Sequence, residues 1–158
     1  MEAVRAATAG DLDRLGELAH EFVQGLVTQR GGSLLVGTVG DRPDPAGLAR
    51  RLADLVDDPG HLVLVGAVDR AVCGFALAHL GVSHAEGTIG VLEGCYVEPA
   101  ARGVGVGRLL LDTVVAWLGE QGCSGVDGTA LPGDREAKNF YESAGFKARL
   151  LTMHRAIG

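Results

Sequence analysis

The chain has 158 residues, 47% of them hydrophobic and 22% charged, and these values predict one soluble globular domain over residues 1–158. Its formal net charge of −6 disfavours nonspecific nucleic-acid binding, which depends on a basic surface. The longest apolar run, HLVLVGAV, is far shorter than the roughly 20 residues of a membrane span, and no basic segment followed by an apolar one opens the chain, so we expect a cytoplasmic protein without a membrane partner.

The N-terminal segment predicts a strand followed by a helix. EAVRAA, residues 2–7, can form a short strand. Thr8 and Asp11 resemble a capping box, and apolar residues then recur at helical spacing. We therefore expect a helix over residues 12–26.

A second helix is predicted beyond a segment that is rich in helix breakers. SLLVGTV, residues 33–39, can form a short strand or an apolar loop, because glycines, Asp41 and Pro43 interrupt any long element there. Asp44 as the cap and Pro45 at the first helical position then open the second helix.

The middle of the chain predicts antiparallel strands. HLVLVGAV (61–68) and AVCGFALAHL (71–80) are separated by two residues and are typical of a hairpin. IGVLEGCYV (89–97) predicts a further strand after the polar loop 81–88.

Helices and strands alternate towards the C-terminus. The pattern predicts a helix over about 107–118, a strand at 124–131, a helix at 135–144 capped by Asp134, and a last strand at 146–156. The order of elements indicates a mixed α/β fold.

Between the strand 89–97 and the helix that follows, glycines occupy every second position. A helix N-terminus exposes unpaired N–H groups and partial positive charge, and glycines before it let an anion approach without meeting a Cβ. The stretch therefore predicts a phosphate site with basic residues at its rim, although the glycines could also serve only a tight strand-to-helix turn. The residues concerned are Arg102, Gly103, Gly105, Gly107 and Arg108.

Two familiar phosphate loops do not match this stretch. A Walker loop ends in Gly-Lys-Ser/Thr, but Arg108 and Leu109 follow Gly107 here. The dinucleotide fingerprint Gly-x-Gly-x-x-Gly lacks its third glycine, since Arg108 stands in that position, and the stretch does not follow an opening βαβ unit.

Two motifs in the expected order resemble the GNAT superfamily of N-acetyltransferases. CYVEPAARGVGVGRLLLD is similar to its motif A, Arg/Gln-x-x-Gly-x-Gly/Ala, with Arg102, Gly105 and Gly107 in the matching positions. KNFYESAGF is similar to its downstream helix. The resemblance implies an α/β fold with a mixed, mostly antiparallel central sheet of about six or seven strands, flanked by about four helices.

The resemblance also implies acetyl-CoA as co-substrate. Its diphosphate would lie on the amides of residues 102–108, and its pantetheine arm would run beside residues 95–97. Family members often carry Asn where this chain has Asp134, to which we assign a helix-capping role. The implied binding residues are Cys95, Tyr96, Val97, Arg102, Gly103, Val104, Gly105, Val106, Gly107 and Arg108.

Tyr141 is the implied general acid of the acetyl transfer. A phenol with a pKa near 10 lies only slightly above a thiol at about 8.5, so it can share its proton with the leaving thiolate. The alternative is a core aromatic on a helix face. The resemblance points to a backbone N–H near Val97, on a splayed strand, for oxyanion stabilisation.

Glu93 is the candidate base, because the polyamine and thialysine branch of the family has a Glu four residues before the position of Val97. An amine with a pKa near 10.4 is mostly protonated at pH 7, so Glu93 would act through water or bind the cation. The alternative is a carboxylate paired with an arginine. His84, in the loop before this strand, is a further candidate for the base or for an acceptor contact.

No metal or disulfide site is indicated. The five histidines have no metal-ligand spacing, and the three cysteines are odd in number and lack a Cys-x-x-Cys pair. Cys95 could be acylated in principle, but nothing near it in the sequence marks an activated thiolate.

These observations predict a single-domain N-acetyltransferase in which an amine, preferably a small cationic one, attacks acetyl-CoA directly. Alternatives are a noncatalytic acyl-CoA-binding sensor or partner module, another acyl group, or a protein N-terminus as acceptor. Residues 26–46 and 81–88 are expected to surround the acceptor, and a homodimer is possible.

Overall fold

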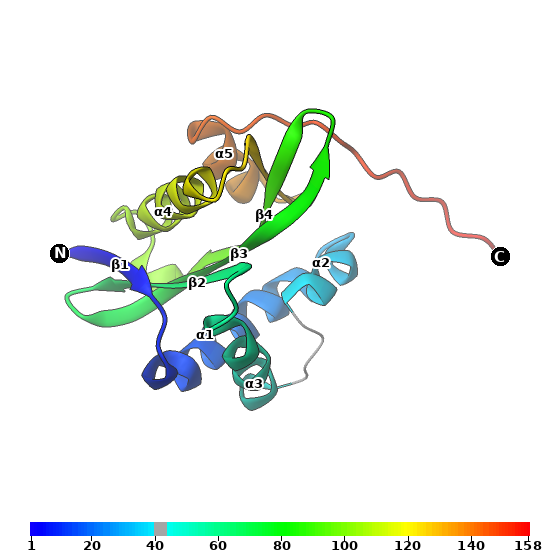
Figure 1. The fold of residues 1–158 in the computed structure, drawn as a ribbon. Helices are drawn as coiled ribbons and strands as arrows, with labels where there is room; N and C mark the ends of the chain where they lie inside the picture. Colours follow the sequence, from blue (N-terminus) through cyan, green and yellow to red (C-terminus); the bar gives the residue numbers. More distant parts are fainter. Residues whose placement is uncertain (40–43) are drawn as a thin grey trace.

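The computed structural model describes residues 1–39 and 44–158, and within these ranges the chain forms one five-stranded sheet with five α-helices (Figure 1). The strand order is β1-β2-β3-β4-β5; the first four strands are antiparallel to their neighbours, and β5 is parallel to β4. The strands are β1 (Glu2–Ala6), β2 (His61–Val68), β3 (Ala71–His84), β4 (Gly87–Val97) and β5 (Gly125–Gly128).

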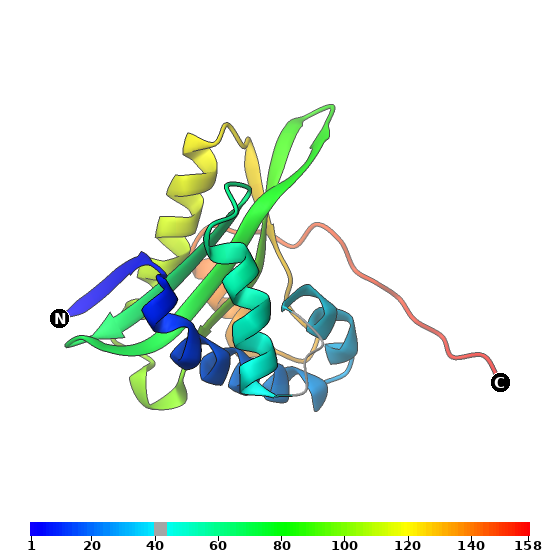
Figure 2. The same ribbon diagram turned by 60° about the horizontal axis from the view of Figure 1, so that its bottom comes forward.

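Helices cover both faces of this sheet (Figures 1 and 2). The first three helices lie on one face, and the last two lie on the other. They are α1 (Leu12–Val27), α2 (Gly32–Val39), α3 (Pro45–Val56), α4 (Val106–Glu120) and α5 (Arg135–Ser143), with short 3-10 helices at Ala9–Asp11 and Pro99–Ala101. No described helix is long and apolar enough to span a lipid bilayer.

Alternation along β2 and β3 divides the core between the two faces. Phe75 and Leu77 pack against α1 and α3 in one buried cluster, whereas Ala76 and Leu64 pack against Leu110 of α4 in the other. Successive residues of a strand point to opposite faces, so the apolar runs of the central strands are buried on both sides. The mixed α/β prediction is therefore confirmed.

The last predicted strand is wrong. Residues 146–156 form no strand, and Leu150, Leu151 and Met153 are at least three-quarters exposed along a segment that runs away from the body (Figure 1). A strand needs a hydrogen-bonding edge of its own length, and β5 offers four residues. The sheet of the described chain thus has five strands instead of six or seven.

Two further segments differ from the expectation. Residues 33–39 belong to helix α2, not to a strand or loop. The helix follows Gly31, whose φ is +81°. Its first residue, Gly32, lies so close to the carbonyl of Leu26 that a Cβ there would overlap it. The polar loop predicted at 81–88 is mostly strand, because Ser83 pairs with Thr88 across the β3–β4 hairpin. The predicted breakers Asp41 and Pro43 lie outside the described residues.

Caps fix the start of α3 and both ends of α5. The Asp44 carboxylate accepts from the Gly47 N–H at 2.6 Å, and the Asp134 carboxylate accepts from the Ala137 N–H at 3.0 Å. After α5, Gly145 adopts φ +90°, and the Phe146 N–H donates to the Tyr141 carbonyl at 3.0 Å. The predicted cap at Asp134 is confirmed.

Candidate active site

The strands β4 and β5 separate at the middle of β4. Their parallel pairing ends at Leu92 opposite Gly128, whereas β4 continues to Val97. Within the described chain, the β5-facing edge of residues 93–97 therefore has no strand partner. The predicted splay of this strand is present, and it opens a slot between β4 and α5.

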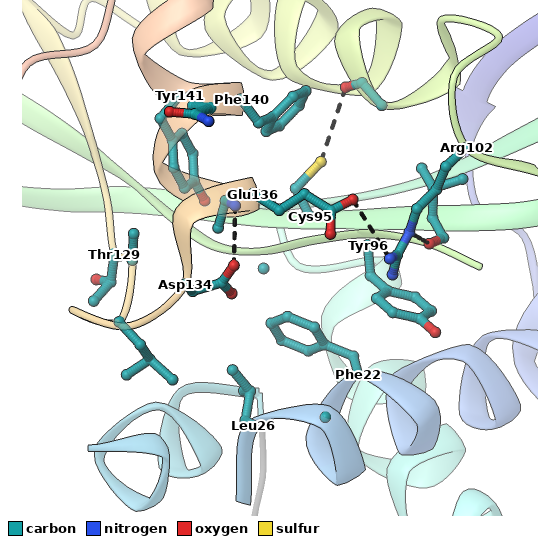
Figure 3. Close-up of a pocket in the computed structure, with 18 of the residues that line it drawn as sticks. Phe22, Leu26, Cys95, Tyr96, Arg102, Thr129, Asp134, Glu136, Phe140 and Tyr141 are labelled. Atoms are coloured by element: carbon teal, nitrogen blue, oxygen red, sulfur yellow. Dashed lines mark hydrogen bonds and ion pairs between the residues drawn. The ribbon is translucent and has the colours of Figure 1, made fainter. Parts of the chain in front are cut away.

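A pocket of about 730 Å³ occupies this slot, a volume that suits a substantial organic ligand. Its walls come from the second half of β4, the start of α4, one face of α5, the loop 129–131 and the end of α1. In Figure 3, Cys95 and Tyr141 lie on one side of the pocket, and Phe22 and Leu26 of α1 lie across from them.

The N-terminus of α4 forms one end of the pocket. Gly103 and Gly105 have φ of +87° and +100°, a region that favours glycine, and a Cβ on either would meet no atom within 4 Å. The conformation, and not crowding, requires these glycines. In the described chain the N–H groups of residues 106–108 make no hydrogen bond, so they are free to bind an anion.

Both arginines of the motif lie at the rim and have structural partners. Arg102 Nε donates to the Val97 carbonyl at 2.8 Å, and its guanidinium lies 5.6 Å from the centre of the Tyr96 ring. Arg108 Nε donates to Asp112 at 3.0 Å, and its Nη1 donates to the Ser143 carbonyl of α5 at 3.3 Å. The arginines therefore brace β4 and α5 around the pocket while adding positive charge beside the amides.

Cys95 and Tyr141 lie in the deep part of the pocket. Burial raises the pKa of the Cys95 thiol to about 12, and the thiol donates weakly to the Gly107 carbonyl at 4.0 Å. Burial, with smaller effects of Cys95 and Asp134, raises the pKa of the Tyr141 phenol well above 10.0. At neutral pH the phenol is therefore protonated and able to donate a hydrogen bond, whereas the thiol is a poor nucleophile.

The Tyr141 ring has a defined position. It lies between Phe140 and Phe146, with ring centroids at 5.8 and 5.3 Å. A Cβ on Gly128 would come within 3.0 Å of the ring, so the glycine in β5 leaves the space that the ring needs.

Glu93 lies at an irregularity of β4. Leu77 pairs with Gly94 and Ala78 pairs with Leu92, so Glu93 is an extra residue in the strand, a β-bulge. Its carboxylate contacts His79 Nε2 at 3.1 Å instead of an arginine. Burial raises the pKa of Glu93, although His79, His61 and Arg51 oppose that shift.

Eleven of the twelve residues predicted for the site line this one pocket. They are Tyr141, Glu93, Cys95, Tyr96, Val97, Arg102, Gly103, Gly105, Val106, Gly107 and Arg108. Val104 is not among the lining residues, and its side chain is about half exposed. His84 lies exposed near the tip of the β3–β4 hairpin and does not line the pocket.

The wall opposite Cys95 was not predicted residue by residue. The pocket is also lined by Phe22 and Leu26 of α1, by Gln29 in the turn after α1, by Leu35 of α2 and by Thr129 to Leu131. The apolar members follow the helical spacing of core residues, so their sequence pattern does not distinguish a pocket wall from a core. Part of the expected acceptor segment 26–46 thus lines the pocket; its residues 40–43 lie outside the described chain.

Metal ligands and disulfides are not found in the described residues. No group of three or more histidine, cysteine, aspartate or glutamate side chains there could hold a metal ion. Cys73, Cys95 and Cys123 are free thiols.

Comparisons with known proteins agree with this geometry. A family model described as the acetyltransferase (GNAT) family matches residues 26–146. The chain is similar to the aminoglycoside N(6′)-acetyltransferase type 1 of Stenotrophomonas maltophilia, with 35% identity over 118 residues that span 72% of this chain and 76% of that protein.

Solved structures share the fold over the whole chain. A crystal structure described as a transcriptional regulator from Bacillus halodurans C-125 is 25% identical, with a TM-score of 0.76 over 98% of this chain and 100% of that one. AAC(6′)-Iy, in complex with the bisubstrate analogue CoA-S-monomethyl-acetylneamine, is 16% identical, with a TM-score of 0.74 over 99% of both chains. The chain therefore belongs to the acetyltransferase (GNAT) family and is an acetyltransferase enzyme.

Proposed function

We propose that this protein transfers the acetyl group of acetyl-CoA to the amine of a small cationic molecule by direct attack. The observation that carries the proposal is that one pocket combines three chemical groups. The free N–H groups at the start of α4 lie at one end, the protonated phenol of Tyr141 lies in its depth, and Glu93 of β4 is part of its lining.

The residues present fit CoA. The free amides of residues 106–108, approached over the Cβ-free Gly103 and Gly105, suit a diphosphate without a metal. The unpaired edge of residues 93–97 offers backbone groups to the amides of a pantetheine arm. When bound, acetyl-CoA supplies the activated acyl group as a thioester.

The chemistry of the remaining pocket favours direct attack. Tyr141 can donate its phenolic proton to the departing thiolate, and a backbone N–H of the splayed strand near Val97 can stabilise the oxyanion. The high pKa of the Cys95 thiol disfavours an acyl-cysteine intermediate. The amine therefore takes the acyl group without a covalent enzyme intermediate.

The acceptor side favours a cationic amine with an apolar or sugar-like body. Glu93 lines the pocket, and Phe22 and Tyr96 add aromatic surface, with ring centroids 5.9 Å apart. The 35% identical relative is named for acetylating the 6′-amine of aminoglycosides, so this class of polycationic amine is the first acceptor to test. A cytoplasmic location and a homodimer stay predictions from the sequence.

The test is thiol release from acetyl-CoA with a panel of aminoglycosides, polyamines, amino acids and peptide N-termini. Two aminoglycosides that differ in carrying an amine or a hydroxyl at the 6′ carbon give the matched control for that site. Turnover with one amine class supports the proposal, and turnover with the 6′-amine but not the 6′-hydroxyl compound identifies the acceptor atom. CoA binding without turnover across the panel would favour a binding module instead.

A further inference from the structure

The Glu93 carboxylate belongs to a cluster of ionisable groups on the α3 side of the sheet. Glu93 Oε1 lies 3.1 Å from His79 Nε2, and the side chains are 14% and 26% exposed. The second oxygen, Oε2, is buried and has no hydrogen-bond partner among the described residues. The carboxylate of this pocket-lining residue is therefore held in place by a histidine on the neighbouring strand.

Hydrogen bonding fixes the tautomer of His79. Its Nδ1 lies 2.8 Å from the Leu80 carbonyl oxygen. A carbonyl accepts and cannot donate, so Nδ1 carries a proton. In neutral His79, Nε2 then has no proton of its own.

This tautomer determines the proton count of the pair. At 3.1 Å, a proton between Nε2 and Oε1 makes a hydrogen bond, whereas without that proton two lone pairs face each other. The pair therefore exists in two states. With the shared proton its net charge is zero, and without it Glu93 is ionised, His79 is neutral and the net charge is −1.

Other charged groups around the pair come from three further elements. The His61 ring of β2 lies with its centroid 5.4 Å from that of His79, and His61 Nδ1 lies 3.3 Å from Asp58 Oδ2 in the turn before β2. Arg51 of α3 acts on Glu93 through its charge. His61 and Arg51 favour an ionised Glu93, whereas burial, the larger effect, raises the pKa of Glu93.

We propose that Glu93 and His79 act together as the base of the reaction and hold the proton of the acceptor ammonium between Oε1 and Nε2. This inference rests on the proposed function. The pair without its shared proton takes one proton from the ammonium, directly or through water; the amine nitrogen then bonds to the acyl carbon as the C–S bond breaks. Tyr141 gives a proton to the departing sulfur, and the acylated nitrogen loses its surplus proton, which returns through water to the Tyr141 phenolate. The pair later releases its shared proton to solvent.

His79 is a positioning residue in this scheme, because it acts through Glu93. A lone carboxylate is a weak base for an amine, and a proton shared with an imidazole makes the pair a better one. The structure thus explains how a carboxylate at the bulge can serve an acceptor that is mostly protonated at neutral pH.

The kinetic test compares His79→Gln with the wild type across pH. Glutamine can still donate one hydrogen bond to Glu93 but cannot take up a second proton. We expect kcat at pH 7.5 to fall about tenfold or more. We also expect the acidic limb of kcat/KM for the amine to move by about one pH unit or more towards lower pH, because a single carboxylate then titrates in place of the pair. His154→Gln, in the exposed C-terminal segment, is the control and should leave the profile unchanged.

A second test does not depend on turnover. Imidazole ¹⁵N NMR of the whole protein, with the His79 signals identified by their loss in His79→Gln, should show Nδ1 protonated throughout the titration. The ¹⁵N signals of His79 should differ between the wild type and Glu93→Gln, because the variant lacks the carboxylate that shares the proton.

The two tests separate the possible failures. An unchanged pH profile in His79→Gln, or the same ¹⁵N signals of His79 in wild type and Glu93→Gln, would overturn the pair even if the enzyme acetylates amines. A shared proton in the NMR titration without turnover of any amine would overturn the proposed function and, with it, the catalytic role of the pair.

Discussion

A Cβ on Gly128 would lie 3.0 Å from Cε1 and 3.3 Å from the hydroxyl oxygen of Tyr141, so the last residue of β5 sets the position of the phenol. Gly128 also marks the point where β5 leaves β4. The end of the β4–β5 pairing and the contact with the ring of the proposed acid therefore lie at the same residue.

Gly128→Ala should displace the Tyr141 ring by a few tenths of an ångström. We expect kcat to fall about tenfold, because small misplacements of a reacting group are costly, while CoA affinity changes by about twofold or less. Gly133→Ala is the matched control, since a Cβ there meets no atom within 4 Å. Equal activity of the two variants would contradict this role of Gly128.

Gly105→Val should prevent the approach of CoA to the start of α4. The valine would be strained at φ +100° and would project into open space where the diphosphate is expected. We expect the Kd for CoA, measured by calorimetry, to rise about tenfold or more. Gly119→Val, at an exposed and uncrowded position of the same helix, is the control and should leave the Kd for CoA within about twofold of the wild type. A similar loss of CoA affinity in both variants would show that the glycine motif is only structural.

Cys95 should not become acylated. With its pKa raised to about 12, the thiol holds almost no thiolate at neutral pH. Rapid-quench mass spectrometry of the enzyme with acetyl-CoA and no acceptor should find the Cys95 peptide unmodified. An acetyl-Cys95 species that forms as fast as turnover would require a two-step mechanism.

Asp11 should stabilise the fold in a pH-dependent manner. Arg5 donates two hydrogen bonds to its carboxylate at 2.7 and 2.9 Å, and these, with help from Thr8, lower the pKa of Asp11 from 3.8 to about 2. Because the folded state has the lower pKa, the stabilisation is complete above about pH 4 and is lost as the pH falls through about 2.

We expect Asp11→Asn to lower the free energy of unfolding by about 1 to 2 kcal/mol at pH 7, a value reduced for the exposure of Arg5. In urea titrations, the difference from the wild type should shrink below pH 4 and vanish near pH 2. Asp13→Asn, on the exposed side of α1, should change stability by about 0.5 kcal/mol or less. A deficit of Asp11→Asn that persists at pH 2 would mean that packing, not charge, explains it.

Sequence patterns predicted what depends on local chemistry. Asp134 caps α5 because its side chain reaches an N–H three residues away, and Gly105 begins α4 because the turn needs a positive φ. Such features are encoded within a few residues. The motif around Gly105 was sufficient to locate the helix N-terminus at which we propose that the diphosphate binds.

Features that depend on distant partners were not predictable in this way. Residues 146–156 carry the apolar pattern of a strand but have no matching edge. Residues 33–39 follow Gly32 in helix α2, and Gly32 packs on Leu26 at the end of α1. The contact of Glu93 with His79 depends on a bulge that changes the register of β3 and β4. Phe22 and Leu26 line the pocket because β4 separates from β5 in front of them.

The most direct test of the account is the turnover of Tyr141→Phe at saturating acetyl-CoA and acceptor, with CoA affinity measured in parallel. Phenylalanine keeps the ring between Phe140 and Phe146 and removes one hydroxyl group. We expect kcat to fall about 100-fold, with the Kd for CoA within about twofold of the wild type. A kcat within about threefold of the wild type would contradict the role of Tyr141 as the acid that serves the leaving thiolate.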